Sequence, residues 1–187
     1  MGIKALSDRE LLSLLIGENA VTKLYRGRIL PLIVGDQDND PHPKLVAAME
    51  LALRLLREKI QNGSALASPA VVRDYLSMHF MGKQHEAFVV IFLDAQNRVL
   101  AAKEMFKDTL TQTPVYPREV VREALRRNAA ACIFAHNYPS GVAEPSRSDE
   151  MLTQTLKRAL ALVDVQVLDH FVVGTDSVMS FAERGLL

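Results

Sequence analysis

Cysteine is almost missing from this sequence, and features of secreted or membrane proteins are missing with it. Cys132 is the single cysteine among 187 residues, so an internal disulfide is excluded and a reducing compartment is expected. No apolar run approaches membrane-spanning length, and the start, Met1–Leu6, lacks the long apolar core of a signal peptide. We therefore expect a cytoplasmic protein without a membrane segment.

An excess of charge is also missing. The chain has 22 Lys and Arg against 22 Asp and Glu, which gives a formal net charge of zero at pH 7. A neutral chain has no general electrostatic attraction to nucleic acid, to an anionic membrane or to an acidic substrate. The apolar fraction of 49% is ordinary for a globular protein, and the length suits one well-buried domain with a smaller appendage.

The first third of the chain, residues 1–62, is predicted to be a small helical region. Ser7 and Glu10 form a capping-box pattern that starts a short helix, and Gly17 ends it. The stretch from Glu18 to Asp40 ends in an acidic loop. Apolar residues then repeat at helical spacing from Pro43 to about Gln61.

A turn-forming stretch, Asn62–Ala65, separates this region from the predicted main domain, residues 65–187. The main domain alternates helical and strand patterns. We expect helices from Ser68, from Pro117, from Ser146 to about Leu162, and in a short stub ending at Leu187. We expect strands at Glu86–Asp94, Val99–Phe106, Thr109–Val115, Ala129–His136, Val165–Val173 and Val178–Ser180. This order predicts an α/β sandwich with a mixed sheet, because the first two strands form a hairpin and must be antiparallel.

The most informative stretch runs from His136 to Asp149. An apolar strand delivers His136 to its end, where Asn, Pro, Ser and Gly break the backbone into a loop. Ser146 then has the pattern of a helix N-cap, with Asp149 at the third helical position. One interpretation is a capping box and nothing more. The other places an imidazole and a carboxylate together at the mouth of a sheet, where metal ligands and catalytic groups usually lie.

This stretch resembles the JAMM motif of MPN (JAB) metalloproteases, and it is most similar to the RadC branch of that family. Ala5–Gly17 also resembles the start of RadC-type proteins, in which a helix-hairpin-helix segment follows; here that segment is expected to be a degenerate remnant. The resemblance implies an MPN/JAB-type (cytidine-deaminase-like) fold over about Ser68–Leu187. The matching residues are His136, Asn137, Pro139, Ser140, Gly141, Pro145, Ser146, Arg147 and Asp149.

The resemblance also implies roles for individual residues. His136 and Asp149 would be zinc ligands, and Ser146 would help to hold the oxyanion. In such a site the metal lowers the pKa of a bound water to about 7 and a carboxylate takes its proton. Glu86, which opens the first long strand, is the expected base.

Two other carboxylates remain alternatives for the base. Glu104 lies on the second strand, where it would equally be a solvated edge charge, and Glu119 lies in a helix first turn, where it favours the helix dipole. His170, in an Asp-His string that also resembles the family, is expected to support the site from behind or to make a structural hydrogen bond.

Three positions depart from the family pattern. Tyr138 stands in place of the second zinc-binding histidine, Tyr116 in place of a histidine before Pro-Arg-Glu, and Asp108 in place of a glycine. Phenolate is outside the usual His, Cys and carboxylate ligands of zinc, and a phenol has a pKa of about 10. We therefore expect weak or absent zinc occupancy and little or no peptidase activity.

Three functions follow from these observations. The first is a RadC-like MPN-domain protein with zinc metallopeptidase architecture, hydrolysing peptide or isopeptide bonds if it is active. The second is a catalytically impaired, metal-poor MPN module for protein interaction. The third is a DNA-repair or DNA-binding factor, against which the neutral charge and the acidic loop argue. A protein or peptide is the expected substrate or partner, and the sequence leaves the oligomeric state open.

Overall fold

The structure is a computed structural model that describes residues 3–37, 39–62, 69–107, 115–139 and 141–187. The chain divides into two compact units, Met1–Leu55 and Leu56–Leu187. Among the described residues, no helix combines the length and the apolar character needed to cross a membrane.

The first unit is helical. A 3-10 turn, η1 (Ile3–Ala5), precedes α1 (Asp8–Ile16), α2 (Glu18–Leu24), α3 (Leu30–Val34) and the start of α4 (Pro43–Asn62). The predicted capping box of α1 is confirmed, since Glu10 N donates to Ser7 Oγ and Ser7 N donates to the Glu10 carboxylate. Buried apolar side chains from all four α-helices form one cluster: Leu12, Ile16, Val21, Leu32 and Leu45.

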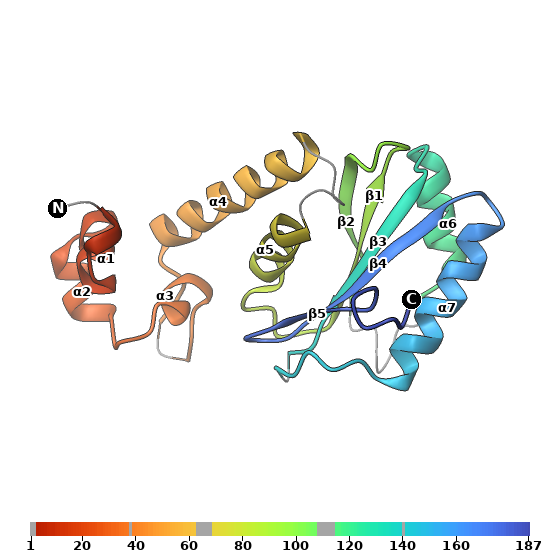
Figure 1. Cartoon of the computed structure of the whole chain (residues 1–187). Coiled ribbons are helices and arrows are strands. Elements are labelled where there is room, and N and C mark those ends of the chain that lie inside the picture. The colour runs from red at the N-terminus through yellow and green to blue at the C-terminus, as the bar shows by residue number, and fades with distance from the viewer. Residues whose placement is uncertain (1–2, 38, 63–68, 108–114, 140) are drawn as a thin grey trace. The chain divides into compact units, whose positions relative to one another are not determined.

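The second unit is built on a five-stranded mixed sheet with the order β2-β1-β3-β4-β5 (Figure 1). The strands are β1 (Ala87–Leu93), β2 (Val99–Lys107), β3 (Ala131–Asn137), β4 (Gln166–Val173) and β5 (Val178–Ser180). β1 pairs antiparallel with β2 and β3, β3 pairs parallel with β4, and β4 pairs antiparallel with β5. The predicted α/β fold with a mixed sheet is confirmed, consistent with an MPN/JAB-type fold.

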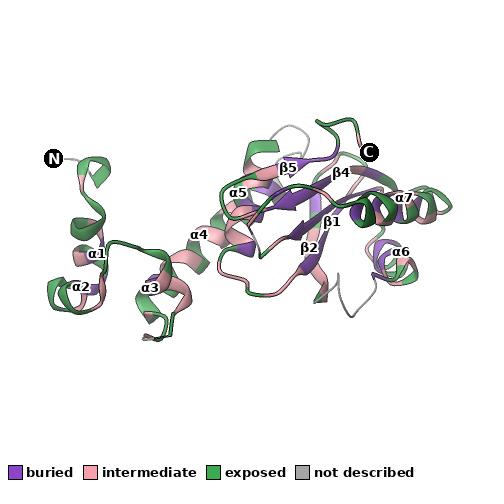
Figure 2. Ribbon diagram, turned by 90° about the horizontal axis from the view of Figure 1, so that it is seen from below, coloured by how far each residue is buried: buried purple, intermediate pink, exposed green. Residues whose placement is uncertain are grey.

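Helices cover both faces of this sheet (Figure 1). α5 (Pro69–Phe80) lies on one face, and α6 (Pro117–Arg126) and α7 (Arg147–Ala161) lie on the other. β1 and β3 are buried along their whole length, as continuous apolar runs in a central strand should be (Figure 2). The core under α6 and α7 includes Val120, Ala124, Leu156 and Leu160 packed with Phe88 and Phe134.

The ends of the main domain differ from the sequence prediction. The predicted helical stub before Leu187 is wrong, because residues 181–185 form hydrogen-bonded turns instead. The predicted strand Thr109–Val115 falls mostly outside the described residues, and Val115 itself is buried but not in a strand. The predicted linker Asn62–Ala65 and the N-cap Ser68 fall almost wholly outside them too, so the boundary between residues 62 and 65 stays a prediction.

Candidate functional site

His136 lies at the carboxyl end of the central strand β3, buried and only 3% exposed. It is paired in register with Phe88 on β1 and with Val172 on β4. The next residue, Asn137, fixes the start of β1, because its Oδ1 accepts from Ala87 N at 2.8 Å and its Nδ2 donates to His85 O at 3.0 Å. These two bonds hold the chain segment containing Glu86 beside the end of β3.

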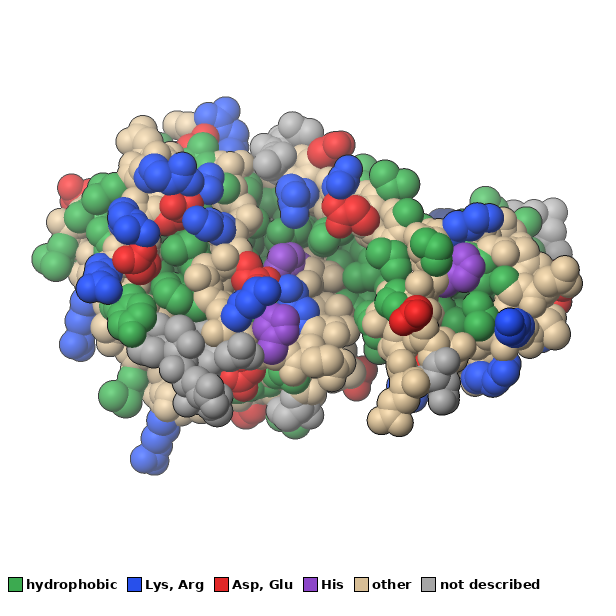
Figure 3. All heavy atoms as spheres, turned by 180° about the vertical axis from the view of Figure 1, so that it is seen from behind, with side chains coloured by type: hydrophobic (Ala, Val, Ile, Leu, Met, Phe, Trp, Pro, Cys, Tyr) green, Lys and Arg blue, Asp and Glu red, His purple; other side chains and the backbone are tan. Residues whose placement is uncertain are grey.

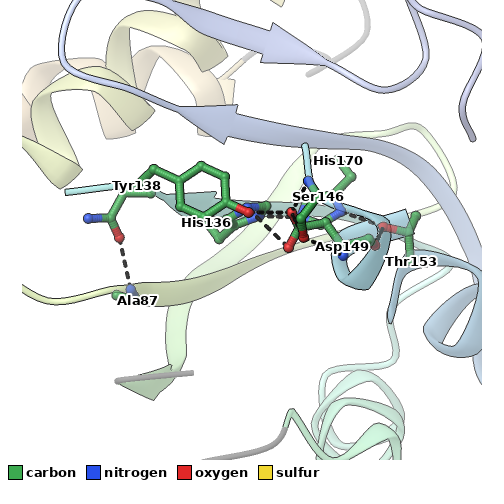
Figure 4. Close-up of polar contacts among 8 residues, drawn as sticks. Ala87, His136, Tyr138, Ser146, Asp149, Thr153 and His170 are labelled. Carbon is green, nitrogen blue, oxygen red and sulfur yellow. Dashed lines mark hydrogen bonds and ion pairs between the residues drawn. The ribbon is translucent and has the colours of Figure 1, made fainter. Parts of the chain in front are cut away.

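Asp149 reaches the same place from the first turn of α7, and it is 1% exposed. Ser146 N and Ser146 Oγ each donate to Asp149 Oδ2 at 2.7 Å, and Asp149 N donates back to Ser146 Oγ at 3.2 Å (Figure 4). The capping box is therefore real. It also aims the carboxylate at β3, so the two interpretations of this motif do not exclude each other.

Tyr138 points its hydroxyl at this carboxylate. Tyr138 Oη donates to Asp149 Oδ2 at 2.5 Å, and the phenol ring meets the His136 ring edge to face at 5.1 Å between centroids (Figure 4). Burial raises the pKa of Tyr138 to about 12, and the hydrogen bond to Asp149 and the negative charge of Glu86 act in the same direction. At neutral pH the group in the place of the second family histidine is therefore a protonated phenol.

His170 lies beside His136, and both its expected role in supporting the site and its expected structural hydrogen bond agree with this contact. Its Nε2 lies 2.9 Å from His136 Nδ1, and its Nδ1 lies 2.7 Å from Thr153 Oγ1. Thr153 Oγ1 in turn donates to the backbone carbonyl of Asp149 at 2.6 Å. Burial, and then the neighbouring His136, lower the pKa of His170 well below its ordinary value, so His170 is neutral.

Two atoms of the site, a ring nitrogen of His136 and a carboxylate oxygen of Asp149, face each other without forming a hydrogen bond. His136 Nε2 is buried and has no hydrogen-bond partner, and it lies 3.5 Å from Asp149 Oδ1. Burial lowers the pKa of His136, while the Asp149 carboxylate opposes that effect. Two ligands of a tetrahedral zinc ion at ordinary bond lengths are roughly 3.3 Å apart, so this pair alone has a suitable spacing.

The full set of residues does not fit a hydrolytic zinc ion. Such an ion takes three protein ligands and keeps the fourth position for water. Within the described residues, no three His, Cys, Asp or Glu side chains are placed to hold a metal together. Tyr138 lies at the third ligand position of the family pattern, but its hydroxyl donates a hydrogen bond to Asp149 Oδ2. A metal ligand must instead offer a lone pair to the metal.

The three carboxylates considered for the base lie in different surroundings. Glu86 directly precedes β1 and is close enough to Tyr138 for its charge to affect the pKa of the phenol. Glu104 is engaged by Lys83 at 2.7 Å. Glu119 forms ion pairs with Arg118 and Arg122. Proximity to Tyr138 favours Glu86, whose role as a base stays a prediction.

Thr153 is the site residue that sequence reasoning missed. A signal existed, since Thr153 lies four residues after Asp149 and so on the same face of the predicted helix. Nothing local indicated that His170, 17 residues further on, would meet it.

Comparison with known proteins agrees with the fold. The family described as "RadC-like JAB domain" matches residues 66–186. A UPF0758 protein of Nitrosomonas eutropha is 62% identical over 144 residues, which cover 77% of this chain and 64% of the relative. A UPF0758 protein of Nitrosospira multiformis is 50% identical over 202 residues, covering 97% of this chain and 90% of the relative. A third, from Polaromonas sp., is 48% identical and covers 100% of this chain and 92% of the relative.

The chain thus spans less than two thirds of the length of the Nitrosomonas relative and nearly all of the other two. The family match covers the whole sheet and the three helices packed on it. It also includes His136, Tyr138, Ser146 and Asp149, the residues that meet at the end of β3. The chain belongs to the RadC-like JAB domain family.

Proposed function

We propose that this protein is a JAB domain without a working zinc hydrolase centre, and that it acts by binding a protein or peptide. The observation that supports this proposal is the 2.5 Å hydrogen bond from Tyr138 Oη to Asp149 Oδ2. A phenol with a pKa of about 12 keeps its proton at pH 7, and this proton occupies one oxygen, Oδ2, of the carboxylate that a zinc ion would need.

A groove beside the edge of the sheet supports the peptide partner. It has a volume of about 310 Å³ and is lined by Val142, Ala143 and Glu144 on one side and by residues of β5 on the other. β5 is the last strand in the sheet order. An extended peptide can add to such an edge through main-chain hydrogen bonds.

A zinc-dependent peptidase is the second candidate, and one observation favours it. His136 Nε2 is buried, unpartnered and 3.5 Å from Asp149 Oδ1, so two of the three family ligand positions keep a suitable arrangement. Peptide or isopeptide hydrolysis would then require Tyr138 to leave Asp149, or to lose its phenol proton to solvent or another base and act as a phenolate ligand.

The Tyr138→His variant tests the proposal. It restores the third family ligand on an otherwise unchanged scaffold, so we expect bound zinc to rise toward one ion per chain after dialysis against zinc. The matched control is Tyr116→His, which makes the same substitution at a half-exposed ring stacked under Arg118. This control should leave the zinc content as low as in the unaltered protein. An unchanged zinc content in Tyr138→His would show that the pocket lacks more than one ligand.

Nucleic acid is not the partner we propose. The arginines of α6 are paired with acidic side chains, Glu119 with Arg118 and Arg122, and Glu123 with Arg126 and Arg127. On the face of the molecule drawn in Figure 3, acidic side chains likewise lie among the basic ones. Each carboxylate lowers the local excess of positive charge that phosphate contacts need. We therefore expect no electrophoretic shift of a DNA duplex or single strand at low salt, where phosphate-driven binding is strongest. A shift that vanishes with added salt would contradict this expectation.

A further inference from the structure

One backbone carbonyl, Asp149 O, determines the direction of the hydrogen bonds that link Thr153, His170 and His136. Asp149 O can only accept, so the 2.6 Å contact with Thr153 Oγ1 must use the single proton of the threonine hydroxyl. If the hydroxyl donated elsewhere, two acceptor oxygens would face each other at 2.6 Å. Thr153 Oγ1 can then only accept in its second contact, the one with His170.

The next two bonds follow from the first. His170 Nδ1 lies 2.7 Å from Thr153 Oγ1 and must carry the proton of that bond. A neutral imidazole has one N–H, so His170 Nε2 is an acceptor. His136 Nδ1, 2.9 Å away, must then be the donor in its bond with His170.

The ring of His170 is fixed in this orientation by aromatic side chains. It stacks on Phe181 at 4.8 Å between centroids, and it meets Phe88 and Phe134 edge to face at 5.7 and 5.8 Å. His170 is fully buried, so both ring nitrogens depend on protein partners for their hydrogen bonds. A ring turned over about Cβ–Cγ would place carbon atoms where Nδ1 and Nε2 now meet Thr153 and His136, so both hydrogen bonds would be lost.

We propose that Thr153 and His170 are positioning residues that hold His136 in the tautomer with a proton on Nδ1, so that a bare Nε2 lone pair faces Asp149 Oδ1. All described donors to the Asp149 carboxylate, namely Tyr138 Oη, Ser146 N and Ser146 Oγ, meet Oδ2 and leave Oδ1 open toward His136. The structure therefore maintains a pair of electron-rich atoms in a buried place. This inference is independent of the proposed function, because the hydrogen bonds have the same direction whether the domain is a hydrolase or a binding module.

The test is a long-range ¹H–¹⁵N correlation spectrum of the full chain, ¹⁵N-labelled and stripped of metal with EDTA, at neutral pH. The spectrum distinguishes a protonated ring nitrogen from a bare one, and the signals are assigned from their loss in His136→Gln and His170→Gln. We expect a protonated Nδ1 and a bare Nε2 for both residues. A proton on His136 Nε2 in the unaltered protein would overturn the proposal.

Thr153→Val tests whether the threonine hydroxyl sets the direction of the hydrogen bonds between His170 and His136. Without the hydroxyl, His170 Nδ1 has no acceptor, so His170 should move its proton to Nε2 and donate to His136 Nδ1. The proton of His136 should then move to Nε2, where Asp149 Oδ1 can accept it. Thr153→Ser keeps the hydroxyl and should keep the original pattern.

Thr155→Val is the matched control, because Thr155 Oγ1 makes the same bond to the carbonyl four residues earlier, Met151 O, on the exposed side of α7. It should leave both imidazoles unchanged. If Thr155→Val moved the His136 proton, or if Thr153→Val did not, the assignment to Thr153 would be wrong. The spectrum of the unaltered protein decides the tautomer even if a variant fails to fold.

Discussion

At the scale of single residues, Asp149 is the centre of the site, and its two carboxylate oxygens have different surroundings. Oδ2 accepts from Tyr138 Oη and from the backbone and hydroxyl of Ser146, while Oδ1 faces His136 Nε2. A carboxylate oxygen can accept more than one hydrogen bond. Tyr138 therefore holds one oxygen of the carboxylate that a metal would use. A histidine at position 138 would remove the phenol bond from Oδ2, leave the two bonds from Ser146, and supply a ligand in the same step.

Glu123 provides a prediction of stability against pH. It is a buried residue that joins α6 to β2, bonding Arg126 at 2.8 Å, with Arg127 and Lys103 at 2.8 and 3.3 Å. The hydrogen bond from Arg126, together with those from Arg127 and Lys103, lowers the pKa of Glu123 to about 2 against the opposing effect of burial. Glu123→Gln should reduce the free energy of unfolding at pH 7 by about 2 kcal/mol, allowing for screening around the exposed Arg126.

The pH dependence of this effect has a definite sign. A lowered folded-state pKa contributes stability that is present above the unfolded pKa, near 4.5, and is lost as the pH falls toward about 2. In urea unfolding curves, the gap between the parent chain and Glu123→Gln should therefore shrink from pH 6 to pH 3. Glu119→Gln is the control, because the arginines paired with Glu119, Arg118 and Arg122, are exposed, and the change should alter stability by less than about 1 kcal/mol. A constant gap over that pH range would contradict the assignment.

Residues were predictable from the sequence where local pattern determines their place. His136 and Asp149 could be brought together because the end of the strand, the loop and the capping box lie within fourteen consecutive residues. The contact of Tyr138 with Asp149 was not predictable from spacing, although the misfit of a phenol at a zinc position was. The bond from Thr153 to His170 depends on how α7 packs across β4, which no local pattern encodes.

At the scale of elements, capping and apolar runs predicted most of the structure. The Ser7 and Ser146 boxes both begin helices where expected, and the apolar strands β1, β3 and β4 lie within a residue or two of their predicted bounds. α2 and α3 were missed, because helices of seven and five residues are too short to show a helical period. Each of these helices buries one side chain in the apolar cluster of the first unit, Val21 in α2 and Leu32 in α3. Packing in this cluster, rather than local helix propensity, stabilises them.

At the scale of the whole molecule, the sequence predicts that the region before residue 63 is dispensable for folding of the JAB domain. A chain starting at Ser64 should be soluble and should unfold cooperatively. The structure adds a refinement, since the second compact unit begins at Leu56 and the last turns of α4 contribute a buried residue, Ile60. A chain starting at Leu56 should therefore be more stable than one starting at Ser64, by about 2 kcal/mol for the buried isoleucine.

Thermal and urea unfolding of the two shortened chains and the full chain measure this directly. Equal stability of the two shortened chains would show that Ile60 contributes nothing to the JAB domain. An insoluble chain from Ser64 beside a well-behaved full chain would show that the α4 helix belongs to the main core.

We propose that Tyr138 keeps the site from holding zinc, and the zinc content of the unaltered protein decides whether it does. The measurement is elemental analysis of the full chain after dialysis against a small excess of zinc and then against metal-free buffer. We predict far less than one zinc ion per chain, because the third ligand position carries a protonated phenol bonded to Asp149. One zinc ion per chain, lost on changing His136→Ala, would contradict the account and would make Tyr138 or another residue a true ligand.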